Sequence, residues 1–565
     1  MKKRIYFISL FSFFLLFLGI LLFFPIYTTK HLIFYYSIHP FDICIEKTYL
    51  WKIIKLLFFI FYILSSIIIS NLIYSIKLNK SVNEKKNRKV TNSIINSDLN
   101  LLIGYNKDNS PIYLCEKSLY QNILITGTIG SGKTSCAMYP FTKQLIEYKS
   151  NIITEKIGML ILDVKGNFHS QVSYYAQKNN RLDDLIIIEP GGKYKYNPLN
   201  KPNLKASVLA NRLKNILLLF SPNNSESYWL DKVEQILTEC IKLCRLYNDN
   251  YVTFEELHNL VNNPNYYTKK IEILRNLFLT QKLSQEDMYN LSSALNFFEN
   301  EYLQLDSRTS SILKSEITRI TNCFLSDYEI YKTFNPSKNE ENFYGFKDLI
   351  MSGKIVVLNM NIAEYKNISK LIATYLKFDF QTEVLSRLSH KESLRKVAFI
   401  SDEYHEYVTS NDADFFAQCR ESKCINILAT QSYSSLLNTL KDEKTFKVLI
   451  QNIVNKLWFR TDDYFTIENV QKQIGKEEKL KTSTTISESA KETHYNFFTN
   501  TLNSKLSNIS ESINKYSQSE FIYDTSFFTQ KLETFSCLSF LSNGEQIITP
   551  QKITLIPYFI SEERR

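Results

Sequence analysis

The stretch "NILITGTIGSGKTSC", residues 122–136, constrains the fold of this 565-residue chain more than any other. Gly127, four intervening residues and "GKT" fit the pattern G-x-x-x-x-G-K-[ST]. An apolar, isoleucine-rich run precedes the pattern, and "TSCAMYPFTKQLIEY" after it can begin a helix that Pro140 kinks. A strand, a glycine-rich turn and a helix in this order predict a phosphate-binding loop in an α/β domain. A glycine-rich turn without a ligand is the less favoured interpretation.

The residue types of this loop match the chemistry of ATP and Mg²⁺. Its glycines let backbone amides turn toward the phosphates, assisted by the positive end of the following helix. We expect Lys133 to neutralise the β- and γ-phosphates, and the Thr134 hydroxyl to bind Mg²⁺. The expected nucleotide-binding residues are Gly127, Thr128, Ile129, Gly130, Ser131, Gly132, Lys133, Thr134 and Ser135.

A second protein ligand for Mg²⁺ is normally an aspartate that ends another strand of the same sheet. Two apolar runs end in this way, "IGMLILDVKGN" at Asp163 and "RKVAFISDEYHEY" at Asp402 and Glu403. The adjacent pair suits hydrolysis better, because Asp402 can hold the metal while Glu403 polarises the attacking water. For Asp163, capping of a helix is an equally good interpretation.

Two further residues are candidates for sensing or stabilising the phosphates. Gln431 follows the apolar run "CINILAT", and an amide at such a strand tip can hydrogen-bond the γ-phosphate or the attacking water. Arg420 lies in "AQCRESK", in a helix or its terminal turn. The usual role of such an arginine is a surface ion pair. The alternative is a finger that reaches the γ-phosphate bound by a neighbouring subunit.

The beginning of the chain predicts a membrane anchor. Residues 5–27 and 56–76 are almost wholly apolar, and about 20 such residues span a bilayer as a helix. The first run is too long for a signal peptide and lacks a small-residue cleavage site. Basic residues precede it and also fill residues 77–89, which places both ends of the chain in the cytoplasm.

Charge and composition exclude several other classes of protein. The excess of positive charge in residues 1–89 equals the whole net charge of +10, so the remainder is formally neutral. We therefore interpret the basic run as a determinant of topology rather than as a patch for DNA or anionic lipid. Nine scattered cysteines without a CxxC pair argue against a disulfide framework and a zinc site. Residues 205–340 have helical periodicity and lack β-branched strands, which predicts an all-α domain.

The order of these motifs resembles that of the type IV secretion coupling proteins, the TraG/TraD-like membrane ATPases of conjugation. "LDVKGN" is similar to their D-P-K-G-E box, although Val164 and Asn167 replace its proline and its acidic residue. "SYWLDKVEQIL" and "RTSSILKSEITRITNCFL" resemble parts of their helical insertion. "FISDEYHEY" matches their second acidic motif, and the last segment, through "PYF", resembles their closing strands.

The resemblance implies a RecA-like P-loop NTPase domain of the α/β class, with an inserted all-α domain and two preceding transmembrane helices. The expected organisation is a membrane anchor (1–89), two parts of the nucleotide-binding domain (90–204 and 341–480) around the all-α insertion (205–340), a flexible Ser/Thr/Asn-rich segment without a packed core (481–519), and closing strands (520–565).

The resemblance also implies an ATP hydrolase that couples a DNA or nucleoprotein substrate to a type IV secretion channel. Its partners would be channel components and a relaxase–DNA complex or protein substrate. A homohexamer would place each site between subunits and bring Arg420 into it, beside Lys133, Glu403 and Gln431. Two alternatives remain open: a DNA translocase of the chromosome-partitioning type, and a receptor whose nucleotide only switches assembly. Whether the cargo is DNA, protein or both is open.

Overall fold

The computed structural model describes most of the chain beyond residue 98. Apart from isolated residues before residue 63, the described ranges are 99–163, 165–220, 227–280, 283–389, 394–489, 494–497, 501–503 and 508–563. The two expected spans lie almost wholly outside this part of the chain, as does the basic run 77–89. None of the helices in the described ranges combines the length and the apolar character needed to cross a bilayer.

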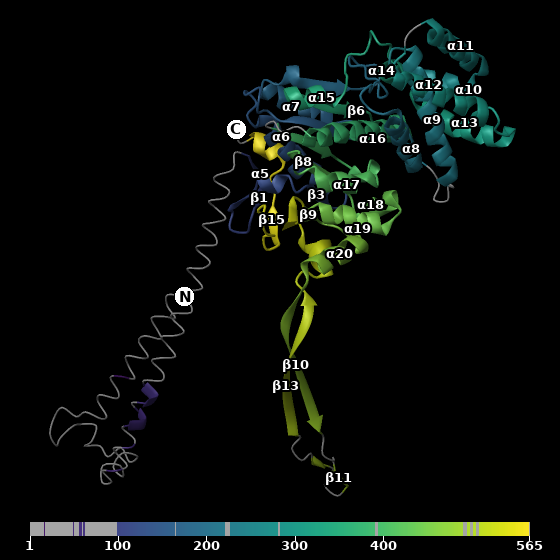
Figure 1. The fold of residues 1–565 in the computed structure, drawn as a ribbon. Helices are drawn as coiled ribbons and strands as arrows, with labels where there is room; N and C mark the ends of the chain where they lie inside the picture. Colours follow the sequence, from purple (N-terminus) through teal and green to yellow (C-terminus); the bar gives the residue numbers. More distant parts are fainter. Residues whose placement is uncertain are drawn as a thin grey trace. The chain divides into compact units, whose positions relative to one another are not determined.

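One sheet of eleven strands organises the unit that contains residues 97–565 (Figure 1). Its order is β2-β1-β15-β14-β9-β3-β8-β7-β4-β6-β5. The strands are β1 (Asn100–Tyr105), β2 (Pro111–Cys115), β3 (Ile123–Thr126), β4 (Gly158–Asp163), β5 (Leu185–Ile188), β6 (Ile355–Asn359), β7 (Val397–Ser401), β8 (Cys424–Thr430), β9 (Asn455–Phe459), β14 (Ser536–Phe540) and β15 (Gln551–Thr554). The run from β9 to β5 is parallel, and the remaining strands join it in antiparallel pairs.

Both faces of the parallel part are covered, so its strands are almost continuously apolar. Every residue of β4, β7 and β8 is buried. Along β4 the side chains alternate between two cores: Leu160 and Leu162 belong to one, Met159 and Ile161 to the other. Helices that contribute to the buried clusters around this part of the sheet include η1 (Lys133–Met138), α6 (Tyr139–Glu147), α7 (Phe168–Lys178), α16 (Ile362–Ser386), α17 (Asn411–Gln418), α18 (Tyr433–Leu440), α19 (Glu443–Asn452) and α20 (Tyr464–Ile474).

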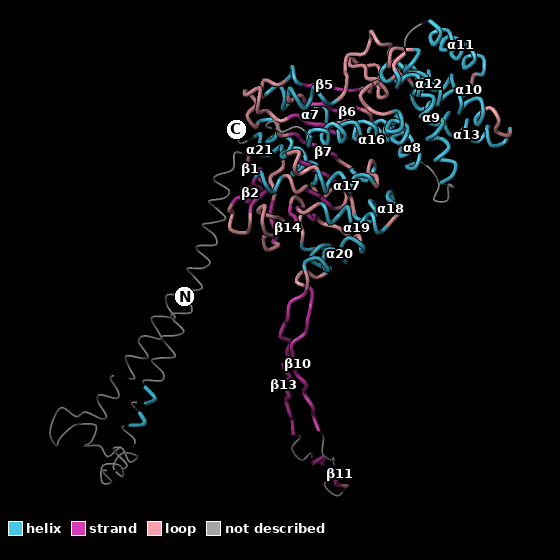
Figure 2. Tube along the Cα trace, viewed as in Figure 1, coloured by secondary structure: helices cyan, strands magenta, loops and turns pink. Residues whose placement is uncertain are grey.

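The connection from β5 to β6 contains only helices among its described residues (Figure 2). They are α8 (Ala206–Phe220), α9 (Ser227–Tyr247), α10 (Phe254–Asn262), α11 (Pro264–Thr280), α12 (Gln285–Phe297), η3 (Phe298–Tyr302), α13 (Ser307–Leu325), α14 (Tyr328–Phe334) and α15 (Phe346–Ser352). Side-chain caps at Thr253, Ser284 and Asp306 fix where three of them begin. Phe254 stacks on Phe324 at 3.8 Å between ring centroids, inside a core that continues onto the sheet.

The Ser/Thr/Asn-rich stretch, where we expected a flexible segment, is paired into a long ribbon (Figures 1 and 2). Strand β10 (Lys476–Ser489) runs antiparallel to β13 (Asn508–Phe521), and β11 (His494–Asn496) to β12 (Thr501–Asn503). Its described side chains are mostly exposed, so it has no packed core. Backbone pairing needs no apolar side chains, which is why composition alone does not indicate this ribbon.

Candidate functional site

The glycine-rich loop lies between β3 and η1, at the carboxyl end of the parallel strands. The amide of Gly127 donates to the Thr430 carbonyl at 3.4 Å, and the amide of Thr128 to the Arg460 carbonyl at 2.9 Å. Gly132 has φ +99°, and a Cβ there would lie 2.6 Å from Cδ1 of Phe535. The loop is therefore held between the ends of β8 and β9 and the segment before β14, and glycine is required where Phe535 covers it.

Lys133 directs its ammonium into the loop. The side chain is buried, and Nζ donates to the carbonyls of Gly127 at 2.5 Å and Thr128 at 3.1 Å. Burial lowers the pKa of Lys133. The negative charges of Glu403 and Asp402 act in the opposite direction but do not outweigh the burial. A Cβ built on Gly130 meets nothing within 4 Å, so the loop is open at this point. A buried ammonium beside loop amides and a helix amino end is complementary to a polyphosphate.

Thr134 and Asp402 meet directly. The Thr134 hydroxyl donates to Oδ2 of Asp402 at 2.9 Å, and the Asp402 amide extends the β7–β4 pairing by donating to the Leu162 carbonyl at 3.1 Å. Burial, with the nearby charges of Glu403 and Asp163, raises the pKa of Asp402 to about 6. A hydroxyl and a carboxylate at one point are ligands that Mg²⁺ accepts, with phosphate oxygens and water completing its shell. The described residues contain no cluster of three His, Cys, Asp or Glu that could hold a metal alone.

Glu403 follows in an unusual backbone conformation, with φ +50° and ψ +46°. Burial acts to raise its pKa, but the hydrogen bond and charge of Lys165 outweigh burial and hold the pKa of Glu403 below its usual range. The other carboxylate oxygen, Oε2, is buried without a hydrogen-bond partner among the described residues. A left-handed glutamate costs conformational energy, and such strain concentrates at functional sites. The site thus holds an ionised carboxylate with a free oxygen that can accept a proton from water.

The structure adds Lys165 to the residues expected at the site. Its Nζ lies 2.8 Å from Oε1 of Glu403 and 4.0 Å from Oδ2 of Asp402. It comes from the turn after β4, where Asp163 accepts the amides of Lys165, Asn167 and Phe168, although Asn167 and not Asp163 is the N-cap of α7. The signal was present in the sequence as the lysine of "LDVKGN", directly after an apolar strand.

His405 and Arg460 also border the site without having been expected there. Nδ1 of His405 lies 3.7 Å from Oε2 of Glu403 and 3.3 Å from the Thr430 hydroxyl, and burial lowers the pKa of His405. Arg460 is exposed at the carboxyl end of β9. Its backbone carbonyl accepts a hydrogen bond from the Thr128 hydroxyl at 3.1 Å. In the sequence, Arg460 could have been identified by its position directly after the apolar run "KLWF".

Gln431 and Arg420 lie at opposite ends of β8. Thr430 pairs with Thr126, so Gln431 follows β8 beside Gly127, at the mouth of the loop. Arg420 is exposed in the turn before β8 begins. A seven-residue strand spans about 20 Å, so Arg420 does not belong to the site of its own chain. The other expected residues, from the loop through Thr134, Asp402 and Glu403 to Gln431, converge on one edge of the sheet.

Comparisons with known proteins agree with this architecture. Residues 396–519 match the family model described as "TraM recognition site of TraD and TraG". No curated protein matches the chain. The solved bacterial conjugative coupling protein TrwBdeltaN70, in its unbound monoclinic form, is 13% identical over 81% of this chain and 88% of its own, with a TM-score of 0.51.

Two nucleotide complexes of the plasmid coupling protein TrwB are similar to the same degree. The complex with ADP and Mg²⁺ is 13% identical over 80% of this chain and 89% of its own, with a TM-score of 0.52. The complex with the ATP analogue ADPNP is 14% identical over 78% and 86%, with a TM-score of 0.50. At these identities the solved structures show a shared fold.

Proposed function

We infer that this chain, which belongs with the type IV secretion coupling proteins by fold and by the sequence of residues 396–519, is an ATP hydrolase that couples a DNA or nucleoprotein substrate to a type IV secretion channel. One observation carries the enzymatic part of this proposal. The glycine-rich loop, the Thr134–Asp402 contact and the ionised Glu403 meet at one edge of the sheet. This is the arrangement needed to bind a nucleotide and to activate water beside it.

Each residue of the site has a separate role in the proposed hydrolysis. Lys133 and the amides of the loop bind the phosphates, and Thr134 and Asp402 would hold Mg²⁺. When bound, Mg²⁺ neutralises charge on the phosphate oxygens and orients them. Glu403 accepts a proton from the attacking water through its free Oε2, while Lys165 fixes the opposite oxygen. Gln431, beside the loop, orients the water or the terminal phosphate.

Arg420 supports a homohexameric assembly in this proposal. Within one chain it is remote from the loop and exposed, so it can contribute to hydrolysis only from a neighbouring subunit. An arginine supplied in trans stabilises the charge that develops on the transferred phosphoryl group. A ring would give each nucleotide site such an arginine.

Membrane anchoring is the part of the proposal that rests on sequence alone. Residues 5–27 and 56–76 have the length and apolarity of spanning helices, and the flanking basic residues place the ATPase domain in the cytoplasm. There the domain would meet a relaxase–DNA complex or protein substrate, and the channel components would lie beside it at the membrane.

Purified full-length chain, assayed for ATP hydrolysis with and without single-stranded DNA, tests the proposal. We expect hydrolysis that DNA stimulates several-fold, and loss of hydrolysis in Glu403→Gln with nucleotide affinity retained. Absence of hydrolysis by the wild-type chain, under conditions where it binds ATP, would contradict the enzymatic assignment. Hydrolysis without any response to DNA would contradict a nucleic-acid substrate.

A further inference from the structure

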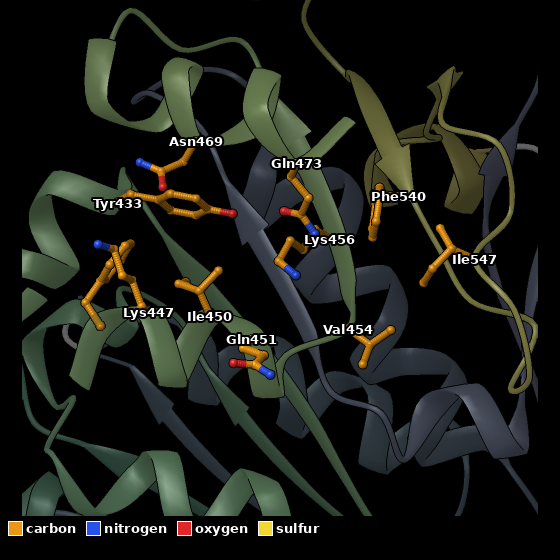
Figure 3. A pocket seen from close by; sticks show the side chains of 11 residues that line it. Tyr433, Lys447, Ile450, Gln451, Val454, Lys456, Asn469, Gln473, Phe540 and Ile547 are labelled. Atoms are coloured by element: carbon orange, nitrogen blue, oxygen red, sulfur yellow. The ribbon is translucent and has the colours of Figure 1, made fainter. Parts of the chain in front are cut away.

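A cavity lies near the amino end of β9, whereas the nucleotide site lies at the carboxyl ends of the parallel strands. The cavity has a volume of about 470 Å³ and is formed where β9 begins, between α19, α20 and the end of β14 (Figure 3). Lys456, near the amino end of β9, pairs with Phe540 of β14 and lies at the centre of the cavity (Figure 3). Arg460, which contacts the glycine-rich loop, is at the other end of β9, about 13 Å away. The two sites are therefore distinct.

The ammonium of Lys456 is buried without an anionic partner. The side chain is 2% exposed, and its Nζ donates to the Ile453 carbonyl at 2.5 Å and lies 5.7 Å from the centre of the Phe540 ring. An ammonium has three hydrogens to donate, and among the described residues no carboxylate lies within ion-pair distance of this one. Burial accordingly lowers the pKa of Lys456 to about 8.

The other buried lysines among the described residues show which partners a buried ammonium group has in this protein. Lys201 pairs with Asp379 at 2.8 Å, and Lys377 pairs with Asp412 at 2.5 Å. Lys133 has only backbone carbonyls as partners, and it faces the expected phosphate site. Lys456 resembles Lys133 in having a buried ammonium that, among the described residues, donates only to backbone carbonyls, and Lys456 lines an open cavity. A buried cation placed in this way favours an anion from outside the chain.

The residues that line the cavity indicate which class of anion it can bind. Its walls are apolar, with Phe446, Ile450, Val454 and Phe540, and its lining contains amides but no acidic residue. The second lysine of the lining, Lys447, already pairs with Glu443 at 2.8 Å. Phosphodiesters are usually met by several free basic residues, whereas one buried ammonium between apolar walls suits a single carboxylate carried by apolar neighbours.

We propose that this cavity is a docking site for a peptide segment of a partner protein, with one acidic side chain received by Lys456 and apolar side chains received by the surrounding walls. The proposal rests on the function inferred above, because a coupling protein must recognise other proteins of the transfer apparatus. Most of the lining, from Tyr433 to Gln473, falls within residues 396–519, which match a model described as a recognition site. Electrostatic complementarity of this kind selects among partners.

The test selects twelve-residue peptides from a displayed library on the full-length chain and measures their affinity by fluorescence anisotropy. We expect the selected peptides to carry an acidic residue beside apolar ones. Lys456→Met should weaken their binding at least tenfold, Lys456→Arg should retain most of it, and Lys447→Met should change it less than threefold.

Two opposite substitutions of one residue at the rim of the cavity test whether the bound peptide is acidic, without disturbing the core. Ile547 lines the cavity and is 46% exposed, so Ile547→Glu and Ile547→Lys should both fold. We expect the glutamate to weaken binding of the selected peptides and the lysine to retain or strengthen it. The proposal would be overturned if both variants bound the peptides with equal affinity, or if the selected peptides were basic or wholly apolar. It would also be overturned if no Lys456-dependent peptide were selected, or if a single-stranded oligonucleotide displaced the peptides.

ATP hydrolysis, measured on the same preparations, separates this inference from the proposed function. Neither Ile547 variant should alter the rate of hydrolysis, since Ile547 is remote from the nucleotide site. Lys133→Ala should lose nucleotide binding and keep full affinity for the peptides. A chain that hydrolyses ATP normally but binds no acidic peptide would refute the docking site alone.

Discussion

The hydroxyl of Thr134 donates a hydrogen bond to Oδ2 of Asp402 at 2.9 Å, across 268 residues of sequence. This contact joins the first turn of η1 to the end of β7, and the sheet makes it possible because β3 and β7 are both neighbours of β8. It brings a hydroxyl and a carboxylate to the edge where the loop would present phosphates. The Mg²⁺ site proposed for this chain depends on the pair.

Asp402→Asn should weaken the response to Mg²⁺ more than the binding of nucleotide. The amide keeps the size of the side chain and can accept the Thr134 hydrogen bond, but it lacks the negative charge that holds a divalent cation. We expect the Mg²⁺ concentration for half-maximal hydrolysis to rise about tenfold, equivalent to about 1.4 kcal/mol. Nucleotide affinity in the presence of EDTA should match that of the wild type, and a loss there would indicate a folding defect instead.

Lys165→Met should lower kcat about tenfold and leave KM unchanged. The methionine occupies similar space but cannot donate to Oε1 of Glu403, so the carboxylate loses the contact that orients it. Lys165→Arg should recover much of the rate, because a guanidinium can make the same ion pair. Steady-state kinetics of the three chains, with nucleotide affinity as the control, check this. A parallel rise in KM would instead assign Lys165 to substrate binding.

Arg420→Ala should bind ATP normally and fail to hydrolyse it. If the arginine acts in trans, mixing Arg420→Ala chains with Lys133→Ala chains should restore activity at interfaces that pair an intact loop with an intact arginine. Hydrolysis measured across mixing ratios should therefore pass through a maximum. A flat, inactive series from co-assembled rings would remove the support for a finger in trans.

Asp412→Ala should destabilise the fold by about 3 kcal/mol or more, because it leaves the Lys377 ammonium buried and unpaired. The same carboxylate accepts the Tyr404 hydroxyl at 2.5 Å, so it also anchors the segment that follows Glu403. Denaturant unfolding should show the loss, and Lys377→Met added to Asp412→Ala should recover part of it. A double variant less stable than Asp412→Ala alone would contradict this account of the pair.

The central strands and their polar ends were predictable because each is encoded by a short contiguous pattern. The runs before Gly127, Asp163, Asp402 and Gln431 are apolar and strand-length, and each forms a buried parallel strand. Carboxyl ends of neighbouring parallel strands meet at one edge, so convergence of the loop, the acidic pair and the glutamine followed from topology.

Contacts between distant segments were not predictable in this way. Tyr105 of β1 pairs with Thr554 of β15, and no local pattern specifies that partner. The cover of Gly132 by Phe535 and the contact of Lys165 with Glu403 likewise depend on how loops pack after the sheet has formed. The ribbon of β10 and β13 was missed because its pairing lies in the backbone and its exposed side chains carry no apolar alternation.

The most direct test of the account is conjugative transfer measured in cells that carry Glu403→Gln in place of the wild-type chain, at matched protein level. The glutamine preserves size and nucleotide binding but cannot accept the proton from water. We expect transfer to fall at least about 100-fold, the effect of losing a general base. Transfer at the wild-type frequency, with hydrolysis abolished in the purified variant, would contradict it and would assign the nucleotide a switching role instead.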